Sequence, residues 1–264
     1  MTVREALRAA EARLARAGVE SPWVDAELLL AHALGVSRTE LYAAPEREAP
    51  DELEPLLARR EAREPLAYVL GEWDFRRLTL KTDRRALVPR PETEVVVERC
   101  LALLAGVDRP RVLDVGVGTG AIALAIADEH PDAQVAGVDS SGEALSLARE
   151  NVKRTGLAVE LRAGGIEAAA EGWDLVVSNP PYVAPEEIEA LEPEVRDWEP
   201  RVALVGDGFQ QELARVAQTE RLVLEVAPRQ AAAVVRELEA LGYAAVTITR
   251  DLAGKDRVVE GVRT

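Results

Sequence analysis

The first 74 residues carry apolar side chains at the spacing of amphipathic helices. In residues 2–17 these side chains are Val3, Leu7, Ala10 and Leu14, which a helix places on one face. Similar patterns, broken by proline or glycine, predict further helices over residues 25–34, 38–43, 51–63 and 66–70. We therefore expect a small helical-bundle domain over residues 1–74, with its charged faces in solvent.

Residues 75–88 alternate weakly between apolar and polar positions. The apolar ones are Leu78, Leu80, Leu87 and Val88. This alternation predicts a β-hairpin or an extended connector, with a turn at Thr82-Asp83. Pro89-Arg90-Pro91 ends it, and a helix is expected from residues 92–94 to about residue 104, because acidic side chains in a first turn suit the helix dipole.

From residue 111 onward, short apolar runs alternate with helical patterns. The expected strands cover residues 112–115, 135–138, 159–161, 175–177, 222–226, 245–249 and 257–262. The expected helices between them cover residues 121–129, 143–155 and 231–241. Strand–helix alternation of this kind predicts an α/β fold with a mostly parallel seven-stranded sheet. The short link before the last run predicts that the final strand is antiparallel.

Composition limits the partners of this chain. Its 264 residues are 48% apolar, enough for one large domain or a small and a medium one. The formal net charge is −15 and the isoelectric point about 4.8, so the global field repels phosphate backbones. The arginine pairs 59–60, 76–77 and 84–85 are isolated and close to acidic residues. We therefore expect no direct nucleic-acid partner.

Cysteine and histidine are too sparse for a metal or disulfide framework. Cys100, the single cysteine, lies in an apolar run, and His32 and His130 are far apart. We expect Cys100 in the core and no bound metal. The amino terminus is charged where a signal peptide needs apolar residues, and no run reaches the roughly 18 apolar residues of a membrane span. These features favour a soluble protein of a reducing compartment, and we expect it in the cytoplasm with no membrane partner. We also expect a monomer.

A glycine-rich turn follows the first strand of the sheet. It reads Asp114-Val115-Gly116-Val117-Gly118-Thr119-Gly120, and its glycines permit a tight turn and a close approach of backbone to a ligand. Asp139 ends the next strand, where a carboxylate typically binds ribose hydroxyls. The spacing lacks the pyrophosphate-binding form, so we expect a cofactor with a ribose. The alternative is that the glycines only pack helix on strand.

Asn179-Pro180-Pro181-Tyr182 follows the apolar run at residues 175–177, at an edge where open α/β sheets bind ligands. The four residues suit the binding of a planar –NH2 group. Asn179 offers a carbonyl acceptor, Pro181 holds Pro180 extended so that its carbonyl can face a pocket, and Tyr182 offers a flat ring. The alternative is a strand that ends at proline and enters a loop.

These motifs together resemble class I S-adenosylmethionine-dependent methyltransferases that act on amino groups. Asn-Pro-Pro-Tyr is shared by enzymes that methylate adenine, some RNA amino groups or the glutamine amide. Three further segments are similar to the bacterial release factor glutamine methyltransferase family, at residues 88–94, 195–201 and 251–257. The resemblance covers most of residues 75–262. It implies a Rossmann-like class I methyltransferase domain over residues 89–264, preceded by the hairpin at 75–88 and the helical domain at 1–74.

The resemblance implies a substrate, a cofactor and a set of site residues. The methyl acceptor would be the glutamine of the Gly-Gly-Gln motif of peptide-chain release factors, docked by the helical domain. Its amide –NH2 would donate to Asn179 and to the Pro180 carbonyl, with Pro181 and Tyr182 completing the catalytic segment. S-adenosyl-L-methionine would be bound by Gly116, Val117, Gly118, Thr119, Gly120, Asp139 and Asn179.

Some positions depart from the family pattern or fit a second interpretation. Members of the family usually carry a polar or aromatic side chain after the third strand that flanks the adenine, whereas here that region reads Arg162-Ala163-Gly164-Gly165-Ile166. Glu225 stands at a family-like position, but a solvated acid at a strand end fits the sequence equally well. Alternative functions are glutamine methylation of a ribosomal protein, amino-methylation of adenine or guanine, and a non-catalytic adaptor on a degenerate methyltransferase fold.

Overall fold

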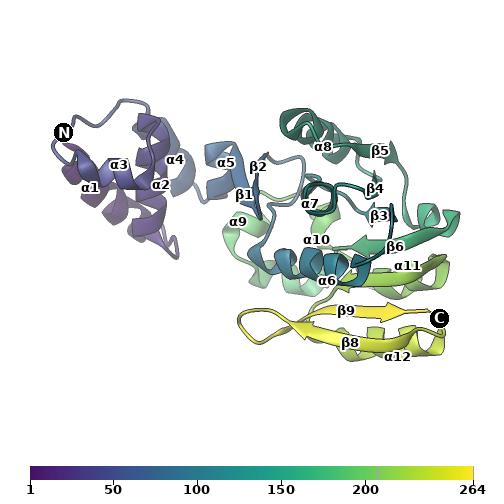
Figure 1. Cartoon of the computed structure of the whole chain (residues 1–264). Coiled ribbons are helices and arrows are strands. Elements are labelled where there is room, and N and C mark those ends of the chain that lie inside the picture. Colours follow the sequence, from purple (N-terminus) through teal and green to yellow (C-terminus); the bar gives the residue numbers. More distant parts are fainter. Residues whose placement is uncertain (207, 264) are drawn as a thin grey trace. The chain divides into compact units, whose positions relative to one another are not determined.

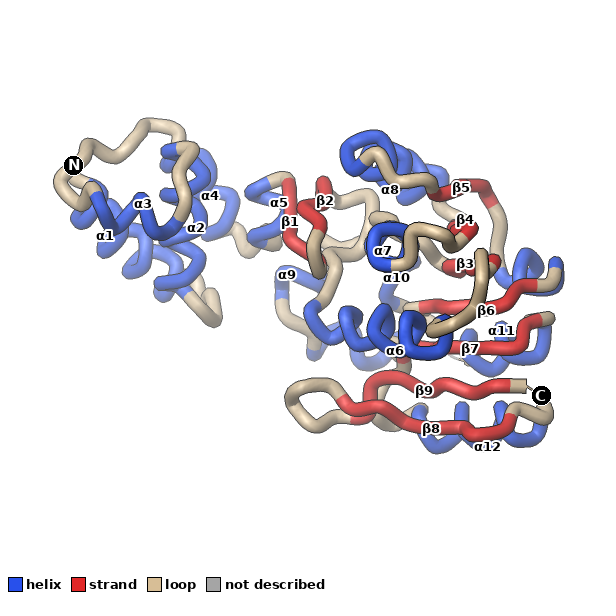
Figure 2. Tube along the Cα trace, in the orientation of Figure 1, coloured by secondary structure: helices blue, strands red, loops and turns tan. Residues whose placement is uncertain are grey.

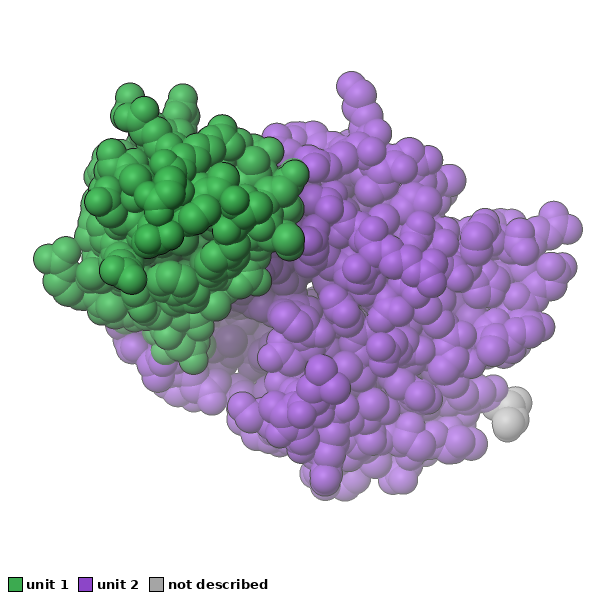
Figure 3. Space-filling model, turned by 60° about the vertical axis from the view of Figure 1, so that its left-hand side comes forward, with its two compact units in different colours: residues 1–72, 191–198 green, residues 73–190, 199–264 purple. Residues whose placement is uncertain are grey.

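The computed structural model describes residues 1–206 and 208–263. The chain forms two compact units, coloured separately in Figure 3. The first comprises Met1–Glu72 together with Leu191–Trp198, and the second comprises the rest. Residues 191–198 thus cluster with the first unit although they follow the sixth strand of the chain.

The first unit is helical, as the apolar spacing predicted. Its helices are α1 (Val3–Arg16), α2 (Pro22–Leu34), α3 (Arg38–Ala43), α4 (Leu53–Glu61), α5 (Leu66–Leu70) and the short α9 (Pro193–Arg196). Helix α1 begins at a capping box in which Thr2 and Glu5 satisfy each other's backbone N–H groups. The predicted face of α1, including Leu7 and Leu14, is buried in the core of this unit.

A buried ion cluster ties helices α2, α4 and α9 together. The Arg60 guanidinium donates to Asp25 Oδ2 at 2.7 Å and lies 2.8 Å from Glu194 Oε1. Glu194 also accepts from Arg63 at 2.7 Å. Arg60 and Asp25 are both buried. Removal of the Arg60 guanidinium would therefore leave the Asp25 carboxylate buried without a cation and without water.

We expect Arg60→Met to destabilise the helical unit by about 3 kcal/mol, the usual cost of breaking a buried ion pair from one side. Hydrogen exchange of the α2 amides as a function of urea measures this. Arg4→Met is the matched control, because the Arg4–Glu46 pair is exposed and such pairs contribute about 0–1 kcal/mol. Equal stability of the two variants would contradict the expectation.

A two-stranded hairpin, β1 (Glu72–Phe75) with β2 (Leu78–Lys81), follows the helices. Its turn lies at Arg76-Arg77, so the prediction of a hairpin turn at Thr82-Asp83 is wrong. Arg76 adopts a left-handed φ of 52°. Its backbone N–H donates to Glu94 Oε1 at 3.0 Å, and its guanidinium pairs with Glu129. These distant carboxylates stabilise a turn that the local sequence does not predict.

The second unit is the predicted α/β sheet, with strands in the order β5-β4-β3-β6-β7-β9-β8 (Figures 1 and 2). Its strands are β3 (Arg111–Val115), β4 (Gln134–Asp139), β5 (Val159–Ala163), β6 (Trp173–Ser178), β7 (Thr219–Glu225), β8 (Ala244–Arg250) and β9 (Asp256–Val262). Strands β3 to β7 pair in parallel, and β9 pairs antiparallel with both β7 and β8. The expected seven-stranded sheet with an antiparallel final strand is confirmed.

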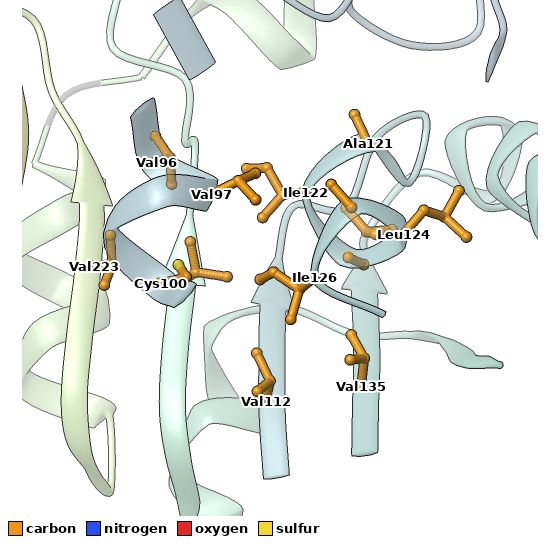
Figure 4. Packing of buried hydrophobic residues seen from close by; sticks show 14 of the residues in the cluster. Val96, Val97, Cys100, Val112, Ala121, Ile122, Leu124, Ile126, Val135 and Val223 are labelled. Carbon is orange, nitrogen blue, oxygen red and sulfur yellow. The ribbon is translucent and has the colours of Figure 1, made fainter. Parts of the chain in front are cut away.

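Helices cover both faces of this sheet. They are α6 (Glu94–Leu104), α7 (Ala121–Glu129), α8 (Gly142–Thr155), α11 (Phe209–Val216) and α12 (Ala231–Ala240). The unit also contains the short helix α10 (Arg201–Leu204) and the 3-10 turns η1 (Pro91–Thr93), η2 (Ile166–Glu171) and η3 (Pro185–Ala190). Alternate strand residues face opposite layers. Val112 packs with α6 and α7, as Figure 4 shows, while Leu113 packs with α11 and α12. Cys100 is buried in the first of these layers, as predicted.

Candidate active site at the carboxyl ends of the parallel strands

A cavity of about 380 Å³ lies within the second unit, at the carboxyl ends of β3, β4 and β6. Strand β3 is central: β4 pairs on one side of it and β6 on the other. In open α/β sheets, a crevice forms at the carboxyl ends of two adjacent parallel strands whose following connections run to opposite sides of the sheet. The volume falls in the range of small-molecule sites.

The glycine-rich turn forms one wall of this cavity. Gly116, Gly118 and Gly120 all have positive φ, at 79°, 54° and 89°, which side-chain-bearing residues rarely adopt. The N–H groups of Gly116 and Val117 both donate to the Val138 carbonyl at 2.9 Å. Gly116, Val117, Gly118 and Thr119 line the cavity, whereas Gly120 is not among its described lining residues and begins α7.

Asp139 lies at the end of β4 and also lines the cavity. One carboxylate oxygen accepts from Ser141 N–H at 2.8 Å, and the other accepts from Gly118 N–H at 3.0 Å. A carboxylate has about four acceptor positions, so each oxygen retains capacity for a further donor. This free capacity, half-buried beside a glycine turn, fits the two hydroxyls of a ribose.

Asn179 and Pro180 both line the cavity, and each carries an oxygen acceptor to which no described residue donates. The Asn179 side-chain Nδ2 donates to Thr93 Oγ1 at 3.1 Å. Among the described residues, no donor reaches Asn179 Oδ1 or the Pro180 carbonyl. Both residues and Pro181 line the cavity. The chain therefore brings Asn179 and Pro180 to the same cavity as Asp139, although 40 positions separate Asn179 from Asp139.

Tyr182 is placed differently from the first three residues of the motif. It is half-buried and not among the described residues that line the cavity. Its hydroxyl lies 3.5 Å from Glu225 Oε1. Burial and the nearby Glu225 carboxyl raise the pKa of Tyr182 to about 12, so its hydroxyl stays neutral.

Glu225 is buried at the end of β7, with 1% of its surface exposed. Its Oε2 accepts from the Thr93 hydroxyl at 2.8 Å. Burial raises the pKa of Glu225 to about 7. The interpretation of Glu225 as a solvated strand-end acid is therefore wrong, because η1 and the segment after β6 cover it.

The loop after the motif is anchored by backbone contacts. Val183 pairs with Val205, and the Arg229 guanidinium donates to the Tyr182 carbonyl at 2.8 Å. Gly206 lies against this segment so closely that a Cβ there would be 2.7 Å from the Pro181 carbonyl oxygen. Only glycine fits without movement of the motif.

We expect Gly206→Ala to lower the rate of the reaction catalysed at this cavity by about 10- to 100-fold, because ångström-scale displacement of a positioning group has that effect. Initial rates at saturating substrates measure this. Gly142→Ala is the matched control, since nothing lies within 4 Å of its added Cβ. Rates within about twofold of wild type in both variants would show that the motif tolerates the shift.

The sequence motifs did not reveal several residues of the cavity wall. Arg90 lines it and pairs with the buried Glu199 at 2.7 Å. Phe209, at the start of α11, also lines it. Gly164 and Gly165 line the cavity after β5, so no side chain there provides the flat contact expected for an adenine.

In each arginine pair noted in the sequence, at least one member is paired with a carboxylate. Arg59 pairs with Glu64, Arg76 with Glu129, and Arg85 with both Asp83 and Glu150. Within the described residues, no helix reaches the length and apolarity of a membrane span. In the same residues, no cluster of His, Cys, Asp or Glu is arranged to hold a metal ion.

The strand order and the glycine turn are those of the class I methyltransferase fold, and solved structures share this fold. The hMettl16 catalytic domain, solved with an RNA hairpin, superposes with a TM-score of 0.59 at 16% identity, covering 79% of this chain and 82% of that one. The Thermus thermophilus 16S rRNA N2 G1207 methyltransferase, solved with AdoMet and guanosine, gives 0.53 at 19% identity, covering 73% and 50%.

Sequence comparison identifies the family. Residues 5–71 match the model of the PrmC N-terminal domain, and residues 94–192 match that of the methyltransferase small domain. The release factor glutamine methyltransferase of Deinococcus radiodurans is 42% identical over 100% of this chain and 99% of its own. That of Caulobacter vibrioides is 40% identical over 100% and 97%. The chain belongs to the release factor glutamine methyltransferase family.

Proposed function

We propose that this protein transfers a methyl group from S-adenosyl-L-methionine to the side-chain amide nitrogen of the glutamine in the Gly-Gly-Gln motif of peptide-chain release factors. One observation carries the proposal. Asn179 Oδ1 and the Pro180 carbonyl are free acceptors that line the same cavity as the Asp139 carboxylate and the glycine turn. A primary amide has two N–H donors to match the two acceptors.

The residues present fit the cofactor that the proposal requires. Asp139 would accept from the ribose hydroxyls, and the turn at residues 116–120 would lie against the cofactor without side-chain obstruction. When bound, S-adenosylmethionine supplies an electrophilic methyl group on a sulfonium.

The protein's own contribution is to orient the acceptor nitrogen. An amide nitrogen is a weak nucleophile because its lone pair is delocalised into the carbonyl. Acceptors at both hydrogens, Asn179 Oδ1 and the Pro180 carbonyl, hold the –NH2 group in one orientation and stabilise positive charge that develops on nitrogen. The N-alkylated, N-protonated amide is acidic enough to lose its proton to water, so the site needs no strong general base.

Charge and family membership favour a protein substrate over a nucleobase. The net charge of −15 and the carboxylate-paired arginines oppose binding of a phosphate backbone. We propose that residues 1–74 form the docking domain for the release factor. This domain exposes Trp23 and Tyr42, with 37% and 52% of their surfaces accessible. We further propose that the enzyme acts in the cytoplasm as a monomer.

Transfer of a labelled methyl group from S-adenosylmethionine to a purified release factor tests this function. We expect label on the Gly-Gly-Gln peptide by mass spectrometry, and none after that glutamine is replaced by alanine. Parallel reactions with ribosomal proteins and with RNA or DNA test the alternatives. Label on any of these, with none on the release factor, would contradict the proposal.

A further inference from the structure

Three side chains from three elements form a continuous hydrogen-bonded chain, which we call the Asn179 relay; Asn179 and Thr93 line the cavity, and Glu225 is not among its described lining residues. Asn179 Nδ2 donates to Thr93 Oγ1 at 3.1 Å, and Thr93 Oγ1 donates to Glu225 Oε2 at 2.8 Å. Thr93 and Glu225 are 4% and 1% exposed. The three residues follow β6, end η1 and end β7, so the fold alone brings them together.

The direction of these hydrogen bonds follows from the number of protons. A threonine hydroxyl has one proton and two lone pairs. A carboxylate accepts only, so the Thr93 proton must point to Glu225. Thr93 therefore has only lone pairs for Asn179, and only the –NH2 end of the Asn179 amide can face it. The carbonyl end of the amide, Asn179 Oδ1, then faces away from Thr93 and is available to a ligand in the cavity.

The two ends of an asparagine amide have nearly the same shape, so packing alone selects poorly between them. If the amide were reversed, Nδ2 would face the donors of the substrate amide and repel them. We propose that Thr93 and Glu225 are positioning residues that hold the Asn179 amide with Oδ1 toward the acceptor nitrogen. This proposal rests on the proposed function only for the identity of the donor to Asn179 Oδ1, the –NH2 group of the substrate glutamine.

Protonation of Glu225 provides a way to reverse the relay. A neutral Glu225 can donate to Thr93, and the freed Thr93 proton can then bind Asn179 Oδ1. Besides Thr93, the groups around Glu225 are Tyr182, Glu92 and Arg257, with the Gln210 amide donating to its backbone carbonyl. Burial is the largest influence on the Glu225 carboxyl and raises its pKa to about 7. The arrangement in which Thr93 donates to ionised Glu225 is therefore fully populated only above that pH.

The relay can be tested without any substrate, because the chain contains only two asparagines, Asn151 and Asn179. Labelling of asparagine side chains with 15N gives two NMR amide groups. We expect the Asn179 signals to shift with pH with a midpoint near 7, and the response to be lost in Thr93→Val and Glu225→Gln. Asn151 donates to the backbone carbonyls of Lys81 and Thr119 and serves as the internal reference.

Kinetics give a second, independent readout. We expect Thr93→Val to lower kcat by roughly 5- to 100-fold, as loss of one buried hydrogen bond implies, with little change in S-adenosylmethionine affinity. Thr93→Ser should restore most of the rate. The acid limb of the wild-type pH–rate profile should disappear in Glu225→Gln. The exposed Thr247→Val in β8 is the control for a threonine-to-valine change.

The experiments distinguish failure of the Asn179 relay from failure of the proposed methylation of release factors. If the wild type labels no release factor, the proposed function fails, and the NMR experiment still decides the relay. Asn179 amide signals that titrate identically in wild type and Thr93→Val would overturn the relay. So would a Thr93→Ser variant as impaired as Thr93→Val.

Discussion

Asn179→Ala is expected to lower the rate of glutamine methylation by about two to three orders of magnitude. Removal of one preorganised hydrogen-bonding group from an active site typically has an effect of this size. Alanine leaves the Pro180 carbonyl as the one remaining acceptor, so the substrate –NH2 group is no longer held at both hydrogens. The loss should fall on kcat, measured at saturating release factor and cofactor.

Cofactor binding distinguishes this effect from collapse of the cavity. Asp139 and the glycine turn do not depend on the Asn179 side chain. Although Asn179 lines the same cavity, the affinity for S-adenosylmethionine in calorimetry should therefore fall by much less than kcat. Glu160→Gln, an exposed change on β5, is the surface control. A kcat within about fivefold of wild type would exclude Asn179 as a principal holder of the amide.

The candidate site was predictable from sequence wherever a motif directly follows a strand. Parallel strands bring their carboxyl ends to one edge, so the glycine turn, Asp139 and Asn179 were expected together and line one cavity. Partners from distant segments were not predictable. Thr93 and Glu225 are 132 positions apart, and the sequence cannot distinguish a buried strand-end acid from a solvated one.

For the fold, too, features set by the local sequence were predictable and features set by distant residues were not. The strands were predicted by their apolar runs, and the helices of the first unit by their periodicity. The hairpin turn was misplaced because carboxylates from residues 94 and 129 stabilise it at Arg76. Helix α11 was missed because it is short and half of its residues are polar. It forms at the sheet, where Leu213 and Ala214 are fully buried, and tertiary packing of this kind overrides local propensity.

We expect Asp139→Ala to weaken S-adenosylmethionine binding by at least about 100-fold, because two hydrogen bonds to a charged acceptor are lost and each contributes about 1.5–3 kcal/mol. The substitution also leaves the N–H groups of Gly118 and Ser141 without their acceptor, so the turn loses its fixed shape before the cofactor arrives. Calorimetric titration with S-adenosylmethionine measures the dissociation constant.

Asp139→Asn separates these two contributions. Its carbonyl can accept from either Gly118 or Ser141, but its –NH2 group faces the other backbone donor, so we expect an affinity between those of wild type and Asp139→Ala. At saturating cofactor, kcat should approach the wild-type value in both variants, because the acceptors for the glutamine amide are on a different strand end. An unchanged dissociation constant with a reduced kcat would instead place Asp139 in the chemical step, and the ribose assignment would fail.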